Sequence, residues 1–256
     1  PSVEYHPEKN PDGKFKAAQL VRACLALKEM CLAYDLPLLS GKDSMYVDGV
    51  LPGAFGETHR VSGLPTLFFT TVGVIGDLRQ AVSLEFKRPG DLVYLLGETR
   101  PELGGSELYE LLGYTGLSVP TVRPREFLPL YQALSGAMAR ELLASCRALC
   151  RGGLGVHLAL CCLAGGLGLK ADISELLPNS PAHVPLYAES AGRFIVTVAP
   201  EQQGDFESVF RGLPFYYLGT VQAEPTFGLR RHNRVLLHAP LADLKEAWTK
   251  RFGGLK

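Results

Sequence analysis

Four consecutive polar residues after a short apolar run form the first candidate site. They are Gly41, Lys42, Asp43 and Ser44. Together they offer a cation, an acceptor and a hydroxyl group beside backbone N–H groups, a combination that can bind a phosphate or a phosphorylated substrate. The stretch is not a P-loop, because Leu36 stands where that motif needs a glycine. An ordinary polar turn is the alternative interpretation.

A glycine pair followed by a serine forms the second candidate. Gly104 and Gly105 precede Ser106, which is placed to cap a predicted short helix. The free N–H groups and the dipole at a helix start favour an anion. We therefore predict contact with a phosphate at these three residues. An N-cap without a ligand is the alternative.

A second glycine pair with two arginines forms the third candidate. Arg151 comes directly before Gly152 and Gly153, and Arg147 lies four positions before Arg151. A guanidinium group has no lone pair and stays protonated, so it cannot hold a metal ion but can pair with a phosphate. The sequence thus predicts an anion contact and no metal here. The alternative is that both arginines lie on a solvated surface.

The cysteines and histidines show no metal-binding or redox spacing. None of the six cysteines forms a C-x-x-C pair, and the six histidines form no H-E-x-x-H group. We predict buried, reduced thiols in a cytoplasmic protein.

Composition excludes several classes of protein. Lysine plus arginine and aspartate plus glutamate number 26 each, so no general field attracts nucleic acid or an anionic membrane. No apolar run approaches the roughly 20 residues of a membrane helix. A hydrophobic content of 46% indicates a folded chain rather than a disordered one. We therefore expect neither a nucleic acid nor a membrane as partner.

The elements that must position these residues mix helices and strands. Residues 15–34 have one helical face made by Leu20, Cys24, Leu27 and Cys31. Residues 49–63 contain too many glycines for a regular element, and residues 64–75 are β-branched and aromatic, which predicts a buried strand. The other predicted strands are 80–86, 91–96, 167–173, 193–198 and 217–221, and residues 229–237 are predicted to form a closing hairpin. The other predicted helices are 127–144, 152–164, 201–210 and 241–252.

Strict alternation of strand and helix is missing, which indicates an α/β fold with α+β layers rather than a Rossmann fold. Three further predictions concern single residues. Glu189 and Arg193 have structural roles, residues 230–234 form a solvated turn, and Trp248 packs the last helix onto the sheet.

An ordered set of motifs resembles one enzyme family over nearly the whole chain. The motifs are residues 8–13, 18–23, 40–45, 65–67, 72–73, 87–94, 103–107, 152–154, 164–168 and 189–193. Their order and spacing are similar to those of the phosphoribosylformylglycinamidine synthases, in the aminoimidazole ribonucleotide synthetase-like superfamily. Any one motif would be a weak signal, but the ordered set is specific.

The resemblance implies a two-domain unit. Residues 1–78 correspond to part of an N-terminal-like domain and 79–256 to a complete C-terminal-like α/β domain. The missing early part would carry magnesium ligands, so the chain resembles a segment of a larger synthetase. The implied reaction joins ammonia from glutamine to formylglycinamide ribonucleotide with ATP. The implied partners are the upstream half of the synthetase, a glutaminase domain or subunit and the small-molecule ribonucleotide, with ATP or ADP as nucleotide and magnesium in the intact enzyme.

The third candidate departs from the family pattern. Family members usually carry His-Asp-x-Ser-(Asp or Glu) before the paired glycines, whereas Arg147 and Arg151 stand at the first and last of these positions here. The segment therefore cannot build the metal site as the family does and is expected to be inactive alone. It would be either the non-catalytic copy of a tandem enzyme, holding a nucleotide as a scaffold, or a degenerate paralogue. Another synthetase or kinase of the superfamily is a further alternative.

Overall fold

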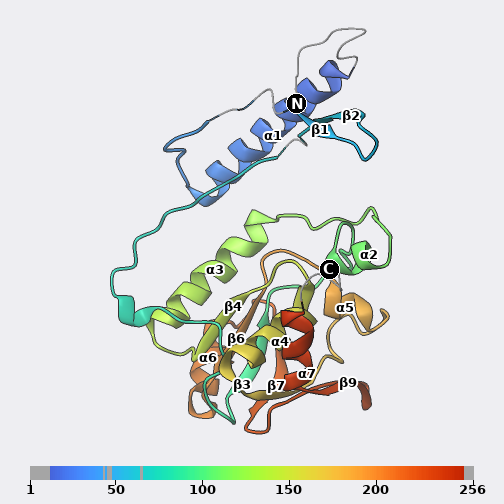
Figure 1. Ribbon diagram of the computed structural model, residues 1–256. Coiled ribbons are helices and arrows are strands. Elements are labelled where there is room, and N and C mark those ends of the chain that lie inside the picture. Colours follow the sequence, from blue (N-terminus) through green and yellow to red (C-terminus); the bar gives the residue numbers. More distant parts are fainter. Residues whose placement is uncertain (1–11, 43, 45–47, 64–65, 251–256) are drawn as a thin grey trace. The chain divides into compact units, whose positions relative to one another are not determined.

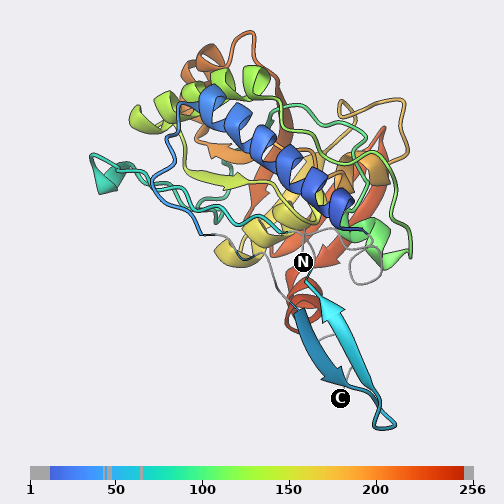
Figure 2. The ribbon, with the colours of Figure 1, turned by 90° about the horizontal axis from the view of Figure 1, so that it is seen from above.

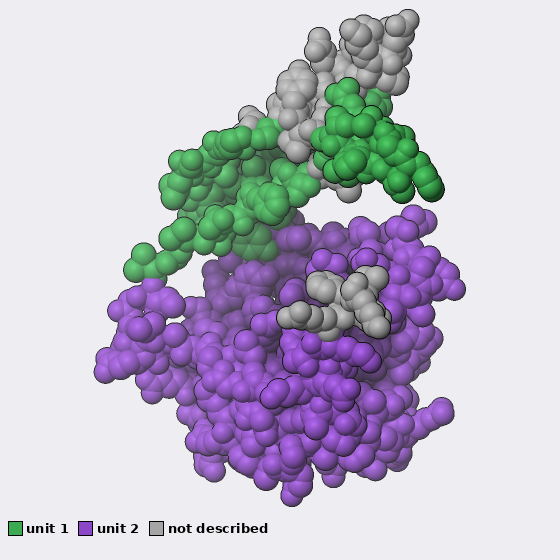
Figure 3. Space-filling view, viewed as in Figure 1, with its two compact units in different colours: residues 1–74 green, residues 75–256 purple. Residues whose placement is uncertain are grey.

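The computed structural model describes residues 12–42, 44, 48–63 and 66–250. The chain divides into two compact units, residues 1–74 and 75–256, which we call unit 1 and unit 2 (Figure 3). The domain boundary predicted at residue 78, and its assignment to family domains, stay predictions.

Unit 1 contains the long helix predicted near its start. This helix, α1, spans Gly13–Tyr34 and ends at Asp35, which adopts the left-handed conformation (φ 54°). The predicted apolar face is not buried, however, because within α1, all of which is described, Gly13 alone is buried. The apolar spacing thus predicted the helix correctly but not the exposure of its apolar face.

The glycine-rich stretch, predicted to be irregular, forms an antiparallel hairpin. Its strands are β1 (Asp48–Pro52) and β2 (Thr58–Ser62), which run side by side in Figure 2. The prediction was wrong because two of the four glycines, Gly53 and Gly56, fall in the turn and Gly63 follows β2, so that Gly49 is the one glycine within the two strands. The Gly53 N–H donates to the Glu57 carbonyl at 2.7 Å, and Gly56 has a φ of +87°, which suits glycine.

The predicted strand at residues 64–75 is also a correction. Residues 64 and 65 lie outside the described residues, and 66–75 form no strand. Phe68 and Val74 are 93% and 97% exposed. A β-branched run becomes a strand only beside another strand, and the described part of the chain supplies none here.

Unit 2 is built on a seven-stranded mixed sheet with the order β4-β6-β3-β7-β5-β8-β9 (Figure 1). Its strands are β3 (Leu92–Leu96), β4 (Ser145–Ala148), β5 (Gly168–Asp172), β6 (Phe194–Val198), β7 (Phe215–Gln222), β8 (Thr226–Arg231) and β9 (Arg234–Pro240). Pairing is antiparallel except between β5 and β8. This mixed sheet confirms the α/β fold class.

Helices cover both faces of the sheet. The helices are α2 (Glu107–Leu111), α3 (Pro124–Ala139), α4 (Gly153–Gly165), α5 (His183–Tyr187), α6 (Gln203–Val209) and α7 (Leu241–Thr249), with short 3₁₀ turns at Leu78–Gln80 and Pro200–Gln202. On β3, Val93 and Leu95 join the core under α4 and α7, whereas Tyr94 and Leu96 join the core under α3 and α6. Alternate residues of one buried strand thus serve two cores.

Two predicted elements of unit 2 differ from the structure, and one strand was not predicted. Residues 80–86 form no strand. They lie beside β4, where the Cys146 N–H donates to the Ser83 carbonyl at 2.9 Å. The helix predicted at 127–144 is α3, which ends at Ala139. Strand β4 was missed, because its four residues at the sheet edge give too short an apolar pattern.

Three side-chain predictions are also corrected. Trp248 is 64% exposed, because Leu241 and Leu244 of α7 face the core instead. Arg231 is buried and donates to the Ser180 and Leu177 carbonyls, so only part of the 230–234 turn is solvated. All six cysteines lie within the described residues and are free. They are not all buried, since Cys24 and Cys150 are exposed.

Candidate functional site

Three connections leave the sheet of unit 2 at the same end. Strand β6 lies between β3 and β4, and Phe194 pairs with both Leu96 and Ala148. Because both pairings are antiparallel, the residues after Leu96, those after Ala148 and those before Phe194 must meet there. This row brings together two of the three candidate segments, although they lie some forty positions apart in the sequence.

Close backbone packing fixes this end of the sheet. A Cβ on Gly97, whose φ is +89°, would lie 2.4 Å from the Gly192 carbonyl oxygen. The Leu149 N–H donates to the Arg193 carbonyl at 2.9 Å. No larger residue fits at position 97 without moving the neighbouring chain.

Arg193 is the buried centre of the site. Its guanidinium donates to the carbonyls of Ser190 and Ala188 at 3.0 and 2.6 Å and to Thr99 Oγ1 at 3.0 Å. Burial lowers the pKa of Arg193 to about 10, although the nearby charges of Glu102 and Glu189 raise it. These bonds are the structural role predicted for Arg193.

The backbone N–H groups of the Gly104–Ser106 turn already donate to carbonyl groups of the chain. Those of Gly104 and Gly105 donate to the carbonyls of Ser118 and Thr115 at 2.8 and 2.7 Å. Ser106 is buried and its hydroxyl accepts from the Tyr109 N–H at 3.3 Å, as predicted for an N-cap of α2. Ligand contact at this turn stays a prediction.

The second glycine pair is tied to the first by Glu189. The Gly152 N–H donates to Glu189 Oε1 at 2.8 Å, and the Glu107 N–H donates to the same oxygen at 2.9 Å. Gly153 has a φ of +68°, and a Cβ there would lie 2.8 Å from the Ala188 carbonyl oxygen. Glu189 thus has the structural role predicted for it.

Both arginines of the third candidate have partners within the chain. Arg147 Nε donates to Nδ1 of His157 at 2.9 Å. The exposed Arg151 pairs with Glu107 and, at 3.8 Å, with Glu110. Phosphate contact by these guanidinium groups stays a prediction.

His157 was missed by sequence reasoning. It lies on the otherwise apolar helix α4 and is 1% exposed. Burial, followed by the charge of Arg147, holds its pKa below the ordinary value. A single histidine among apolar residues was the available signal, because a buried polar group needs a partner.

The first candidate lies in unit 1. Lys42 Nζ donates to Ser44 Oγ at 2.6 Å, and both residues are exposed. Gly41 is exposed as well, and Asp43 lies outside the described residues.

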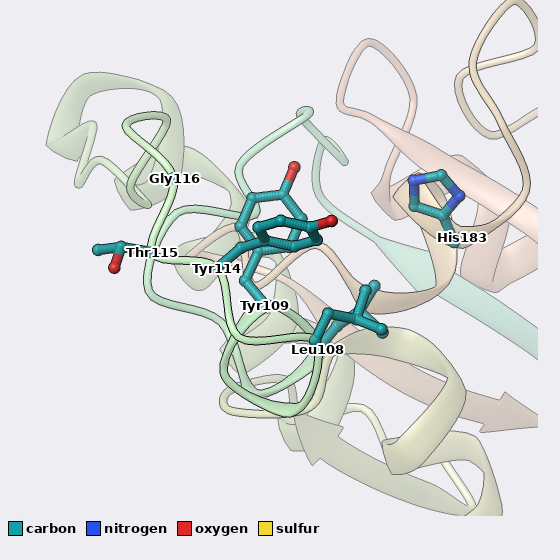
Figure 4. Close-up of a pocket in the computed structure, with 7 residues that line it drawn as sticks. Leu108, Tyr109, Tyr114, Thr115, Gly116 and His183 are labelled. Carbon is teal, nitrogen blue, oxygen red and sulfur yellow. The ribbon is translucent and has the colours of Figure 1, made fainter.

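A pocket of about 670 Å³ opens beside α2. It is lined by Leu108, Tyr109, Leu112, Tyr114, Thr115, Gly116 and His183 (Figure 4). The rings of Tyr109 and Tyr114 meet edge to face, with their centroids 6.0 Å apart. None of the predicted site residues lines this pocket.

The residues of the third candidate do not fit a magnesium ion. Magnesium needs oxygen ligands, whereas Ala148 and Arg151 stand at the two positions for which the resemblance implies acids. Within residues 12–42, 44, 48–63 and 66–250, no group of three or more histidine, cysteine, aspartate or glutamate side chains could hold a metal. Over the same ranges, no helix is long and apolar enough to cross a bilayer.

Comparison with known proteins identifies the family. Residues 88–232 match the model described as "AIR synthase related protein, C-terminal domain". The phosphoribosylformylglycinamidine synthase subunit PurL of Gloeobacter violaceus is 35% identical over 232 residues, which are 89% of this chain and 28% of that protein. The corresponding subunit of Alkaliphilus metalliredigens is 29% identical over 249 residues, 96% of this chain and 32% of that protein.

Solved structures show the same fold. Thermotoga maritima PurL complexed with FGAR matches with a TM-score of 0.59 and 21% identity, over 65% of this chain and 30% of that one. PurL of the same organism complexed with ATP matches with a TM-score of 0.53 and 19% identity, over 64% and 27%. The chain spans about a third or less of the length of the relatives described here. It belongs to the AIR synthase related family, as a PurL-like member.

Proposed function

We propose that the chain is a C-terminal segment of a phosphoribosylformylglycinamidine synthase of purine biosynthesis, working in the cytoplasm. The whole enzyme would use ATP and ammonia from a glutaminase to convert formylglycinamide ribonucleotide to its amidine. Support comes from the names of the curated relatives and from the nucleotide and FGAR complexes of the fold neighbours.

We further propose that this segment does not catalyse the reaction alone. The observation that carries this is that Ala148 and Arg151 stand at the two positions where the family pattern has acids, and that Arg151 pairs with Glu107. Phosphoryl transfer in such enzymes depends on metal ions and cationic side chains to stabilise charge. Without acids at those two positions, this segment would not hold the metal as the family pattern does.

Exposed apolar surface on unit 1 supports a need for the upstream half. Leu32 of α1 is 73% exposed, and Phe68 and Val72 are 93% and 82% exposed. Apolar surface of this extent marks an interaction site in a folded protein. In the proposed enzyme the upstream half of the synthetase covers it.

The test is ADP formation that depends on the ribonucleotide. The purified chain with ATP, magnesium, ammonium and formylglycinamide ribonucleotide should form no ADP above a blank without ribonucleotide. A protein that also contains the upstream half should turn over. Ribonucleotide-dependent ATP hydrolysis by the 256-residue chain alone would contradict the proposal. Tight retention of ADP without turnover would indicate the scaffold role instead.

The first candidate supplies the ligand contact in this proposal. Lys42 and Ser44 hold each other on an exposed segment, so a phosphate can reach both. In the longer protein, Lys42→Ala should weaken nucleotide or substrate binding measured by calorimetry, and unchanged affinity would remove Lys42 from the site.

A further inference from the structure

An exposed apolar segment begins at the end of α2 in unit 2. Between Glu110 and Arg123 the sequence contains no charged residue. Within this stretch, Leu111 and Leu117 are 82% and 98% exposed. Its other exposed large apolar side chains are Leu112, Tyr114, Val119 and Val122. We call residues 111–122 the apolar segment. Exposed apolar surface of this extent on a folded unit marks a contact with another molecule.

Hydrogen bonds and close packing hold the apolar segment in its exposed position. The Ser118 carbonyl accepts from the Gly104 N–H at 2.8 Å. The Tyr114 N–H donates to the Tyr109 carbonyl at 2.7 Å. A Cβ on Gly116, whose φ is +71°, would lie 2.6 Å from the Tyr109 ring. The segment is thus already ordered, so that little conformational entropy would be lost when a partner binds it.

The pocket beside α2 lies next to the most exposed side chain of the apolar segment. Gly116 lines the pocket and directly precedes Leu117 in the chain (Figure 4). Two other lining residues, Leu112 and Tyr114, are themselves exposed, so the pocket opens to solvent. Its volume of about 670 Å³ lies in the range that holds drug-sized ligands, which are larger than one side chain. A projecting leucine and a recess that can take it therefore lie side by side.

The charged residues that flank the apolar segment are already paired within the chain. Glu107 and Glu110, before it, pair with Arg151. Arg123, directly after it, donates to Glu102 Oε1 at 2.9 Å. The described residues that line the pocket include no lysine, arginine, aspartate or glutamate. A partner surface therefore needs no compensating charge, and a second copy of the same surface could approach without like-charge repulsion.

We propose that two copies of this chain associate through the apolar segment, with Leu117 of each copy in the pocket of the other. A two-fold interface needs one self-complementary surface, on which two different features of one copy meet the same two features of the other. Leu117 and the pocket are such a pair of features, because they are neighbours on one surface. A two-fold contact closes on itself, so it produces a dimer and no larger assembly. The association needs neither nucleotide nor ribonucleotide.

Sedimentation equilibrium of the purified 256-residue chain at a series of concentrations tests this dimer. The parent chain should dimerise reversibly. Leu117→Asp should weaken the dimer at least about tenfold, because a carboxylate would have to enter an apolar pocket. Leu112→Asp, which places the charge in the pocket instead, should have the same effect. The matched control is Phe68→Asp, at an exposed apolar position of unit 1, and it should dimerise like the parent.

Four results would overturn the dimer. They are a parent chain that stays monomeric at every concentration, a dissociation constant that Leu117→Asp leaves unchanged, equal weakening by Phe68→Asp, and association that continues beyond two copies. Circular dichroism reports whether each variant folds. If Leu117→Asp does not fold, Leu117→Ala shortens the same side chain without adding a charge and should also weaken the dimer, and an unchanged constant for it would count against the interface.

Discussion

Arg147 Nε lies 2.9 Å from Nδ1 of His157 and donates a hydrogen bond to it, although both side chains are basic. The backbone N–H of Cys150 lies 3.1 Å from the other ring nitrogen, Nε2. The ring therefore faces an N–H donor on each side. Protonation would remove its acceptor and place a second charge beside Arg147, so the neutral ring is favoured.

The fold should accordingly lose stability in mild acid. Burial and Arg147 lower the pKa of His157 in the folded chain, so its contribution is present above its ordinary value of 6.5 and is lost as pH falls through the folded value. Urea unfolding at a series of pH values measures this, and His157→Gln should flatten the profile below pH 6.5. His183→Gln, at an exposed histidine, should leave the profile unchanged.

Removing the buried guanidinium of Arg193 should destabilise the fold strongly. Arg193→Leu leaves the Ala188 and Ser190 carbonyls without their donors, and we expect a loss of about 3 kcal/mol or more in the free energy of unfolding. Arg211→Ala removes an exposed arginine and should change it by less than about 0.5 kcal/mol. Equal effects in denaturant titrations would show that Arg193 does not hold the loop.

Two glycines with similar backbones should respond differently to alanine. Gly105 and Gly153 have φ values of +67° and +68°, but a Cβ meets nothing within 4 Å at Gly105 and backbone atoms at 2.8 Å at Gly153. Gly105→Ala should cost about 1 kcal/mol from backbone strain. Gly153→Ala should cost roughly 1 to 3 kcal/mol more from the clash. Thermal unfolding of both variants measures the difference, and equal losses would contradict the packing at Gly153.

Asp91 should be a site where losing a charge stabilises the fold. It is 2% exposed, and its Oδ2 has no hydrogen-bond partner among the described residues. Burial raises its pKa above the ordinary 3.8, despite Arg88 at 3.7 Å.

The free-energy cost of burying the charged Asp91 carboxylate is therefore absent at low pH and grows as pH rises above 3.8. Asp91→Asn should raise the free energy of unfolding by about 1 kcal/mol at neutral pH and lose this advantage in acid. The exposed control Asp205→Asn should show neither effect.

Much of unit 2 could be predicted because its signals are local. The apolar runs of β3 and β6, the helix after Gly152 and the turn at residues 230–234 each have the expected period and flanking residues. The errors occur where distant partners decide. Residues 66–75 have the composition of a strand but no neighbouring strand within the described residues, and β4 is a strand only because β6 pairs with it.

Only part of the candidate site could be predicted from the sequence. The two glycine segments are visible in the sequence, because paired glycines mark tight backbone approaches. That Glu189 bonds to both could not be read from spacing, since it lies 82 positions from Glu107 and 37 from Gly152. The sheet register at Phe194 supplies that proximity.

The shared row of Leu96, Phe194 and Ala148 has an evolutionary consequence. Three connections leave the sheet at this end, so residues in them can be substituted without altering the strands. A lineage can therefore replace an acid by an arginine such as Arg151 in these connections and keep the architecture. Descendants that differ in chemistry would then be almost indistinguishable in backbone trace.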